Sequence, residues 1–169
     1  ASGPEPLMEI FSGIDNVLKN KIDPDLSPII PDEKGYGKVR PIHILDIGNL
    51  IANNVVSGGV RRSAELFLFD QDDYECLFAK YGINGFWSED HFKQHEAVRQ
   101  EMLNQGIPIP VWFDEIGFRL YDKNINGDSP FNYGRENLNH RHLSNNSIAF
   151  TKRPTDEFLH LVFMLIQLE

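Results

Sequence analysis

The sequence contains a single cysteine, Cys76, among its 169 residues, so no disulfide can form within the chain. Scarce cysteine is typical of a reducing compartment, and we expect a cytoplasmic protein. The sequence also lacks an apolar run of membrane-spanning length and the pattern of a signal peptide. Basic residues are few: 16 Lys and Arg against 25 Asp and Glu give a formal net charge of -9. This balance argues against a nucleic-acid polymer as partner, because counterion release requires a basic surface.

The overall composition is that of an ordinary globular protein, with 41% hydrophobic and 24% charged residues. The length is enough for one domain with a real core. The chain starts at Ala1 without a methionine and stops at Glu169 inside a helical pattern. We therefore expect residues 1–169 to be a single fragment of a longer protein.

Hydrophobic periodicity predicts both helices and strands. Apolar residues at three- and four-residue spacing predict helices over Leu7–Ile22 and Ile42–Val56, the second with Ile44, Ile47, Ile51 and Val55 facing a core. Further helices are expected over Gln71–Tyr81, from Ser88 to Gln105, and after Pro154. Two β-rich runs, Ala64–Phe69 and Leu143–Thr151, predict strands.

The segment between the second helix and the first predicted strand has the composition of a ligand-binding loop. Its residues are Ser57, Gly58, Gly59, Arg61, Arg62 and Ser63. A glycine pair lets a ligand approach the backbone closely, and arginines offer planar donors to phosphate or carboxylate. A helix stop with solvated arginines explains the same local pattern equally well. The spacing matches neither a Walker loop nor a dinucleotide-binding fingerprint.

Other chemically suggestive patterns favour structural roles. Asp122–Asp128 begins like a calcium-binding EF-hand loop, but its twelfth position is Tyr133, where a glutamate is needed. His91 and His95 share a helix face without a third ligand, so we expect a solvated face and no metal site. Cys76 is expected to be buried and inert. Residues 140–142 (His-Arg-His) are weak evidence for anion binding, and nothing supports covalent catalysis.

Four short segments in a fixed order carry a family resemblance. Asp46-Ile47-Gly48-Asn49-Leu50-Ile51 leads into Val60-Arg61-Arg62-Ser63-Ala64-Glu65; an acidic segment, Asp70–Asp73, follows, and then Ser144-Asn145-Asn146-Ser147. This order resembles the large catalytic chain of ribonucleotide reductases, especially the adenosylcobalamin-dependent class. The resemblance implies a slice of the reductase α/β barrel, about two barrel strands with flanking helices.

The resemblance also implies roles for individual residues. The loop formed by Ser57, Gly58, Gly59, Arg61, Arg62 and Ser63 would lie between the substrate base and a deoxynucleoside triphosphate effector, and would transmit specificity. Gly3, Pro4 and Glu5 would match a second effector loop, and Ser144, Asn145, Asn146 and Ser147 would lie near the substrate pocket. The first two helices would belong to the surface that pairs two subunits, or to its mimic in monomeric members, so a homodimer is one option.

The implied parent is a ribonucleoside di- or triphosphate reductase that makes deoxyribonucleotides for DNA synthesis by radical chemistry. Its adenosylcobalamin would bind outside this fragment. Ribose reduction in this family needs a thiyl cysteine and a redox cysteine pair, and Cys76 matches none of these motif positions. The fragment thus holds no catalytic residue and is expected to be inactive alone. The alternatives are a stand-alone nucleotide-binding or regulatory module without catalysis, and a structural fragment that binds nothing.

Overall fold

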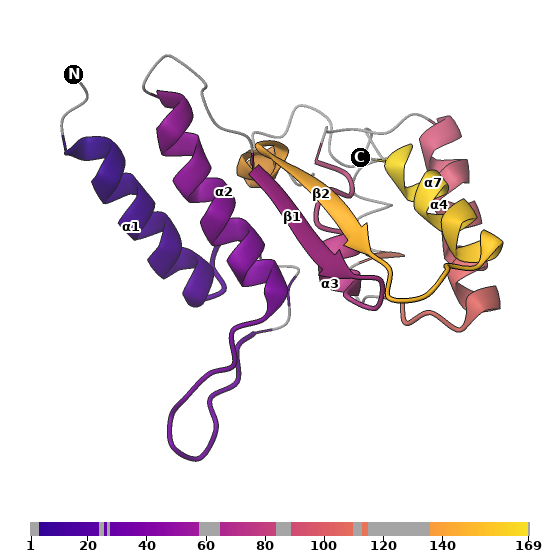
Figure 1. Cartoon of the computed structure of the whole chain (residues 1–169), viewed down its shortest axis with the longest axis horizontal. Helices are drawn as coiled ribbons and strands as arrows, with labels where there is room; N and C mark the ends of the chain where they lie inside the picture. The colour runs from indigo at the N-terminus through magenta and orange to yellow at the C-terminus, as the bar shows by residue number, and fades with distance from the viewer. Residues whose placement is uncertain are drawn as a thin grey trace. The chain divides into compact units, whose positions relative to one another are not determined.

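The structure, a computed structural model, describes residues 4–23, 26, 28–57, 65–83, 89–109, 113–114 and 136–168. These residues form two compact units, one from Ala1–Ala79 with His140–Ala149 and one from Lys80–Asn139 with Phe150–Glu169. Figure 1 shows the elements in chain order. They are α1 (Glu5–Leu18), α2 (Pro41–Ser57), β1 (Glu65–Asp70), α3 (Tyr74–Leu77), α4 (Glu89–Gln105), the 3-10 helix η1 (Glu136–His142), β2 (Ser144–Ala149) and α7 (Asp156–Ile166).

The first unit combines helices with a small parallel sheet, which confirms the predicted α/β class. Strands β1 and β2 pair in parallel, with Glu65 opposite Ser144 and Asp70 opposite Ala149. Helices α1 and α2 lie side by side (Figure 1), and α2 packs against β1. The core contains Ile42, Leu45, Cys76 and Ala79, with Leu26, Phe67 and Phe69 packed against them. Both strands therefore lie within two residues of their predicted bounds.

The predicted core face of α2 is wrong. Ile44 and Ile51 are 57% and 48% exposed, whereas Ile42, Leu45, Asp46 and Asn49 are buried. Polar side chains can occupy a buried face when partners satisfy them, and Asp46 and Asn49 both have such partners. Ile44 and Ile51 are therefore left on the outside of this unit, and Ile47 is partly buried.

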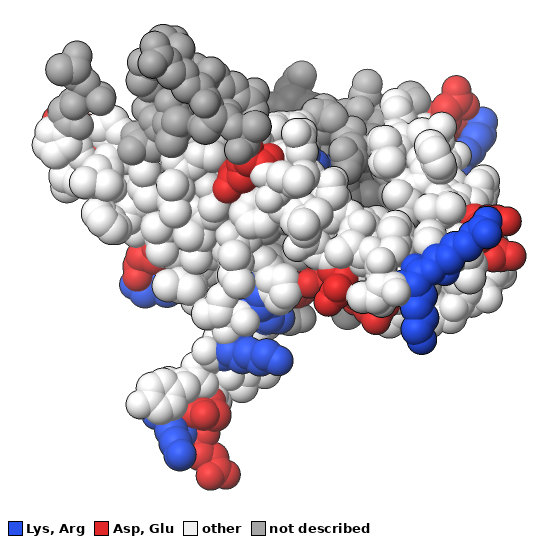
Figure 2. Space-filling model, viewed as in Figure 1, with Lys and Arg blue, Asp and Glu red and all other residues white. Residues whose placement is uncertain are grey.

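Helix α1 is shorter than its apolar pattern predicts. It ends at Leu18, and Asn20 adopts a positive φ of 56°, a left-handed conformation that helix interiors do not accommodate. Leu7, Met8 and Phe11 on this helix are more than half exposed. Figure 2 shows that the surface over α1 and α2 on the viewed side is largely uncharged.

The helix predicted over Gln71–Tyr81 is confined to α3, which covers Tyr74–Leu77. The chain turns first, with the Asp73 N–H donating to the Asp70 carbonyl at 2.9 Å. Asp73 is the N-cap, and its carboxylate accepts from the Cys76 N–H. Cys76 is buried as expected, with 2% of its surface exposed.

The second unit is built on α4 and α7, which pack against each other. The α4 helix ends where the sequence predicts, because Gly106 follows with a φ of 67°. Thr155 caps α7 by accepting the Phe158 N–H at 3.2 Å. Gln105 Nε2 donates to the Glu157 carbonyl at 2.9 Å and joins the two helices. No helix in the described ranges combines the length and apolar content needed to cross a membrane.

Candidate functional site

The predicted specificity loop connects two described elements of the first unit. Helix α2 ends at Ser57 and β1 begins at Glu65, while Gly58, Gly59, Arg61, Arg62 and Ser63 lie outside the described residues. Gly3 also lies outside them. Pro4 stands at the N-cap of α1, followed by Glu5 in the first turn. The structure therefore fixes the two ends of the 57–63 loop.

The strand register brings the predicted substrate-pocket motif, Ser144–Ser147, to the β1 end of this loop. Glu65, the first residue of β1, pairs with Ser144, the first residue of β2. Asn145, Asn146 and Ser147 then pair in turn with Leu66, Phe67 and Leu68. Two motifs that lie about 80 residues apart in the chain thus start side by side at the same edge of a parallel sheet.

The four residues Ser144–Ser147 divide between the two faces of β2, because strand side chains alternate. Ser144 and Asn146 share the face of Phe67, which packs toward α2, and Ser144 Oγ donates to Asn146 Oδ1 at 3.0 Å. Asn145 and Ser147 share the opposite face with Leu66 and Leu68, which are 59% and 67% exposed. On this face Asn145 is exposed and Ser147 is partly buried, whereas Ser144 on the α2 side is buried.

A buried charge cluster underlies the start of β2. The Arg141 guanidinium is fully buried and meets Asp46 at two points, Nε to Oδ1 and Nη2 to Oδ2, both at 2.7 Å. Its Nη1 donates to Asp23 Oδ2 and to the Ala79 carbonyl, each at 2.9 Å. His140 Nε2 donates to Asp46 Oδ1 at 2.7 Å. Such two-point charged contacts are among the strongest hydrogen bonds in proteins.

The electrostatics of this cluster favour the charged forms. Burial alone would raise the pKa of Asp46, but hydrogen bonds from Arg141 and His140 outweigh it and lower the pKa from 3.8 to about 2. Burial alone would lower the pKa of Arg141, but Asp46 and Asp23 hold it above its usual value. The idea that residues 140–142 bind anions is therefore wrong for Arg141, because the protein's own carboxylates occupy its donors.

Asn49, one helical turn after Asp46, contacts the first residue of β2 directly. Its Oδ1 accepts the Ser144 backbone N–H at 2.9 Å, and its Nδ2 donates to the Leu45 carbonyl at 2.8 Å. Asn49 and Ser144 have 0% and 1% of their surfaces exposed. The sequence placed Asp46 and Asn49 in a family motif, but nothing local to them indicates their partners 95 residues away.

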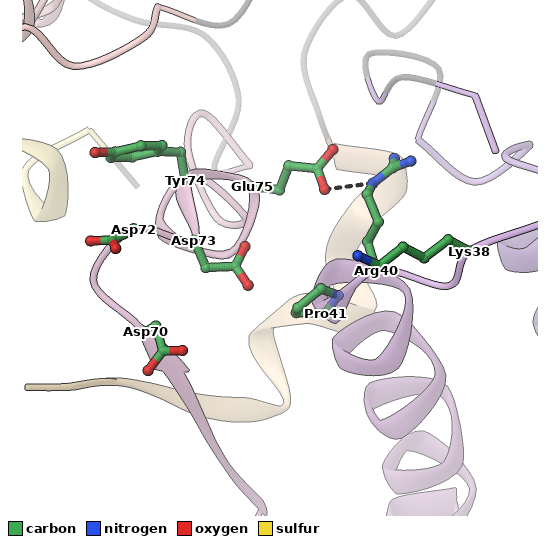
Figure 3. A pocket seen from close by; sticks show the side chains of 8 residues that line it. All are labelled: Lys38, Arg40, Pro41, Asp70, Asp72, Asp73, Tyr74 and Glu75. Atoms are coloured by element: carbon green, nitrogen blue, oxygen red, sulfur yellow. Dashed lines mark hydrogen bonds and ion pairs between the residues drawn. The ribbon is translucent and has the colours of Figure 1, made fainter. Parts of the chain in front are cut away.

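An acidic hollow of about 550 Å³ opens at the other end of β1 (Figure 3). It is lined by Lys38, Arg40, Pro41, Asp70, Asp72, Asp73, Tyr74 and Glu75. Arg40 Nε pairs with Glu75 Oε2 at 2.7 Å, and the Asp73 carboxylate caps α3. Within the described ranges, no group of three or more His, Cys, Asp or Glu side chains is arranged to hold a metal ion.

The second unit contains a buried aromatic cluster around His95. Tyr81 Oη and His95 Nδ1 form a hydrogen bond, and the Phe113 ring stacks on the imidazole with centroids 4.4 Å apart. Burial lowers the pKa of His95 from 6.5 to about 4, so the ring is neutral near pH 7. The expectation of a solvated face for His91 and His95 is wrong for His95, which is 1% exposed.

The thiol of Cys76 lies in the core of the first unit. Burial, followed by the adjacent Asp73 carboxylate, raises its pKa well above the ordinary value. A thiol in such surroundings is a poor nucleophile and a poor electron donor, because the thiolate is the reactive form. The structure thus supports the expectation of an inert cysteine.

Comparisons with known proteins give one consistent result. The chain is 39% identical over 135 residues to the "Adenosylcobalamin-dependent ribonucleoside-triphosphate reductase" of Lactobacillus acidophilus, over 80% of this chain and 16% of that protein. Proteins of the same name from Lactobacillus helveticus and Lactobacillus leichmannii are 30% and 38% identical over equally long matches. The chain thus spans 16% of the length of these curated relatives. No family model and no solved structure matches it.

Proposed function

We propose that this chain, which is homologous to a fragment of the adenosylcobalamin-dependent ribonucleoside-triphosphate reductases, is a section of such an enzyme. The enzyme would reduce ribonucleoside triphosphates to the deoxyribonucleotides needed for DNA synthesis. The observation that carries the proposal is 39% identity over 80% of the chain. The names of the relatives favour triphosphates over diphosphates as substrates.

Within this enzyme, the section would contribute substrate and effector recognition. The loop from Ser57 to Ser63 would contact the substrate base on one side and a deoxynucleoside triphosphate effector on the other. Asn145 and Ser147 would face the substrate from the open side of β2. The pairing of Glu65 with Ser144 supports this arrangement, because it starts both segments at one edge of the sheet.

The proposal assigns no catalytic residue to this section. Cys76 is the only cysteine in the sequence, and one thiol cannot supply both a radical and a redox pair. The adenosylcobalamin, which generates the radical, would be held by parts of the enzyme outside this section. We expect the chain by itself to reduce no ribonucleotide when adenosylcobalamin and a dithiol are supplied. Turnover above a control without protein would contradict this assignment.

The structural setting would be an α/β barrel, to which β1 and β2 contribute two neighbouring strands. Parallel sheets are normally covered on both faces, so the exposed Leu66 and Leu68 are consistent with a face that another part of the enzyme covers. The exposed apolar residues of α1 and the exposed Ile44 and Ile51 of α2 would pair two subunits or pack on another part of the enzyme. Sedimentation of the purified chain tests the first option, which predicts a dimer.

The specificity role is tested at Arg61 in the full-length enzyme. Arg61→Ala should lower activity and weaken the effector-dependent choice among the four ribonucleotides, because coupling between ligands is typically 5- to 150-fold, or about 1–3 kcal/mol. Arg61→Lys should recover only part of the effect, since an ammonium keeps the charge but loses the planar donor pair.

Arg62→Ala is the matched control, with a milder expected effect if its side chain points away from that of Arg61, as neighbouring side chains do along a strand. The measurement is reduction of each substrate with each effector in turn. An Arg61→Ala enzyme with wild-type preferences would refute the loop assignment.

A further inference from the structure

We propose that Asp46 and Asn49 are positioning residues that hold α2, the helix that leads into the specificity loop, to the start of β2, the strand that carries the proposed substrate contacts Asn145 and Ser147. This inference rests on the proposed function. It concerns two residues that lie outside the loop and outside the proposed substrate contacts.

Ser144 contacts both elements that flank the loop, helix α2 and strand β1. On one side, its backbone N–H donates to Asn49 of α2, the helix that enters the loop at Ser57. On the other side, it pairs with Glu65, the first residue of β1, the strand that leaves the loop. The segment between Ser57 and Glu65 therefore connects α2 and β1, and both of these elements contact Ser144 of β2.

The buried charge cluster fixes the position of β2 along α2. Asp46 and Asn49 are three residues apart and lie on the same face of α2. Asp46 binds Arg141 and His140 just before β2, while Asn49 binds Ser144 at its first residue. If β2 slipped by one residue along α2, these buried charged groups would lose their partners, which is strongly unfavourable. The slip would also turn Asn145 and Ser147 to the opposite face.

The fixed contact between α2 and β2 would affect communication between effector and substrate. If an effector shifts the loop at the α2 end, slippage between α2 and β2 cannot absorb the shift. The displacement must instead appear within the loop or at the face that carries Asn145 and Ser147. Asp46 and Asn49 would thereby raise the effector-dependent substrate preference without touching either ligand.

The test compares variants of the full-length enzyme in the reduction of all four ribonucleotides, with and without each effector. Asn49→Leu keeps a similar volume but removes the acceptor of the Ser144 N–H. We expect the effector-dependent preference to fall at least about five-fold towards the value without effector, given the usual range of coupling. Asn49→Asp keeps an acceptor and should recover part of the preference.

Glu75→Gln is the matched control, because it breaks the 2.7 Å pair with Arg40 at the opposite end of α2. It should leave the preference unchanged. The preference is a ratio measured within one preparation, so a smaller amount of folded enzyme does not change it. If Asn49→Leu fails to fold, Arg141→Lys replaces it, since lysine keeps the charge but cannot make the two-point contact with Asp46.

The outcomes separate the two proposals. A wild-type enzyme that reduces no ribonucleotide would refute the proposed function itself. A working wild type, together with Asn49→Leu or Arg141→Lys variants that keep the full preference, would refute the positioning role alone and leave Asp46 and Asn49 as residues of the fold only.

Discussion

Replacing Asp46 by asparagine should destabilise the first unit through loss of a buried charge. The substitution keeps the shape of the side chain but can place an NH₂ group opposite the Arg141 guanidinium, where only an acceptor fits. Arg141 is fully buried and would keep Asp23 as its one carboxylate partner. Breaking a buried pair in this way typically lowers the free energy of unfolding by about 3–5 kcal/mol.

The same contacts lower the pKa of Asp46, which makes this stability depend on pH. A fall from 3.8 to about 2 corresponds to about 2–3 kcal/mol of stabilisation of the folded state by the ionised carboxylate. Because the folded pKa is the lower one, this contribution is fully present above pH 4 and is lost as the pH falls from about 4 to about 2. The difference in stability between wild type and Asp46→Asn should therefore narrow over this range.

Urea unfolding of the chain, followed by circular dichroism, measures both effects. A loss of about 3 kcal/mol moves the urea midpoint by at least about 1 M, since the slope for small proteins is about 1–3 kcal/mol per M. Glu75→Gln is the control, because its pair with Arg40 is partly exposed and such pairs contribute about 0–1 kcal/mol. Equal midpoints for the two variants, or a stability difference that does not change with pH, would refute the role given to the cluster.

Two further predictions concern packing and protonation. For Gly48→Ala, an added Cβ would lie 2.7 Å from Glu65 Oε1 and closer still to the Phe67 ring, so overpacking of about 1–3 kcal/mol should outweigh the gain of about 1 kcal/mol in helix propensity. Gly13→Ala, whose Cβ would meet a leucine methyl at 3.0 Å, should be milder, and urea midpoints in the opposite order would contradict this packing. For His95, the folded pKa of about 4 lies below the ordinary 6.5, so stability should rise by about 3 kcal/mol between pH 4 and 6.5 as the unfolded state loses its proton. In urea unfolding at several pH values, His95→Phe should remove this rise in the free energy of unfolding between pH 4 and 6.5. An unchanged dependence of stability on pH would exclude His95 as its source.

The sequence by itself determined the elements that depend on local signals. Gly106 ends α4 and Thr155 caps α7 where the sequence predicts, because a positive φ and a side-chain cap are properties of single residues. The linear order of the motifs was also enough to indicate the family, since sequence similarity needs no tertiary information. The extents of α1 and α3 were less predictable, because short polar side chains such as Asp73 compete with the helix through local hydrogen bonds.

Only the tertiary structure decided which face of α2 is buried and which groups His140 and Arg141 contact. Apolar spacing favoured the stripe containing Ile44 and Ile51, but the buried face holds Asp46 and Asn49. A buried polar side chain is tolerated only when a partner reaches it, and Arg141 and Ser144 do so from 95 residues along the chain. Pairs so far apart leave no periodic signal in either segment, so the burial of these polar groups follows from the fold and not from local sequence.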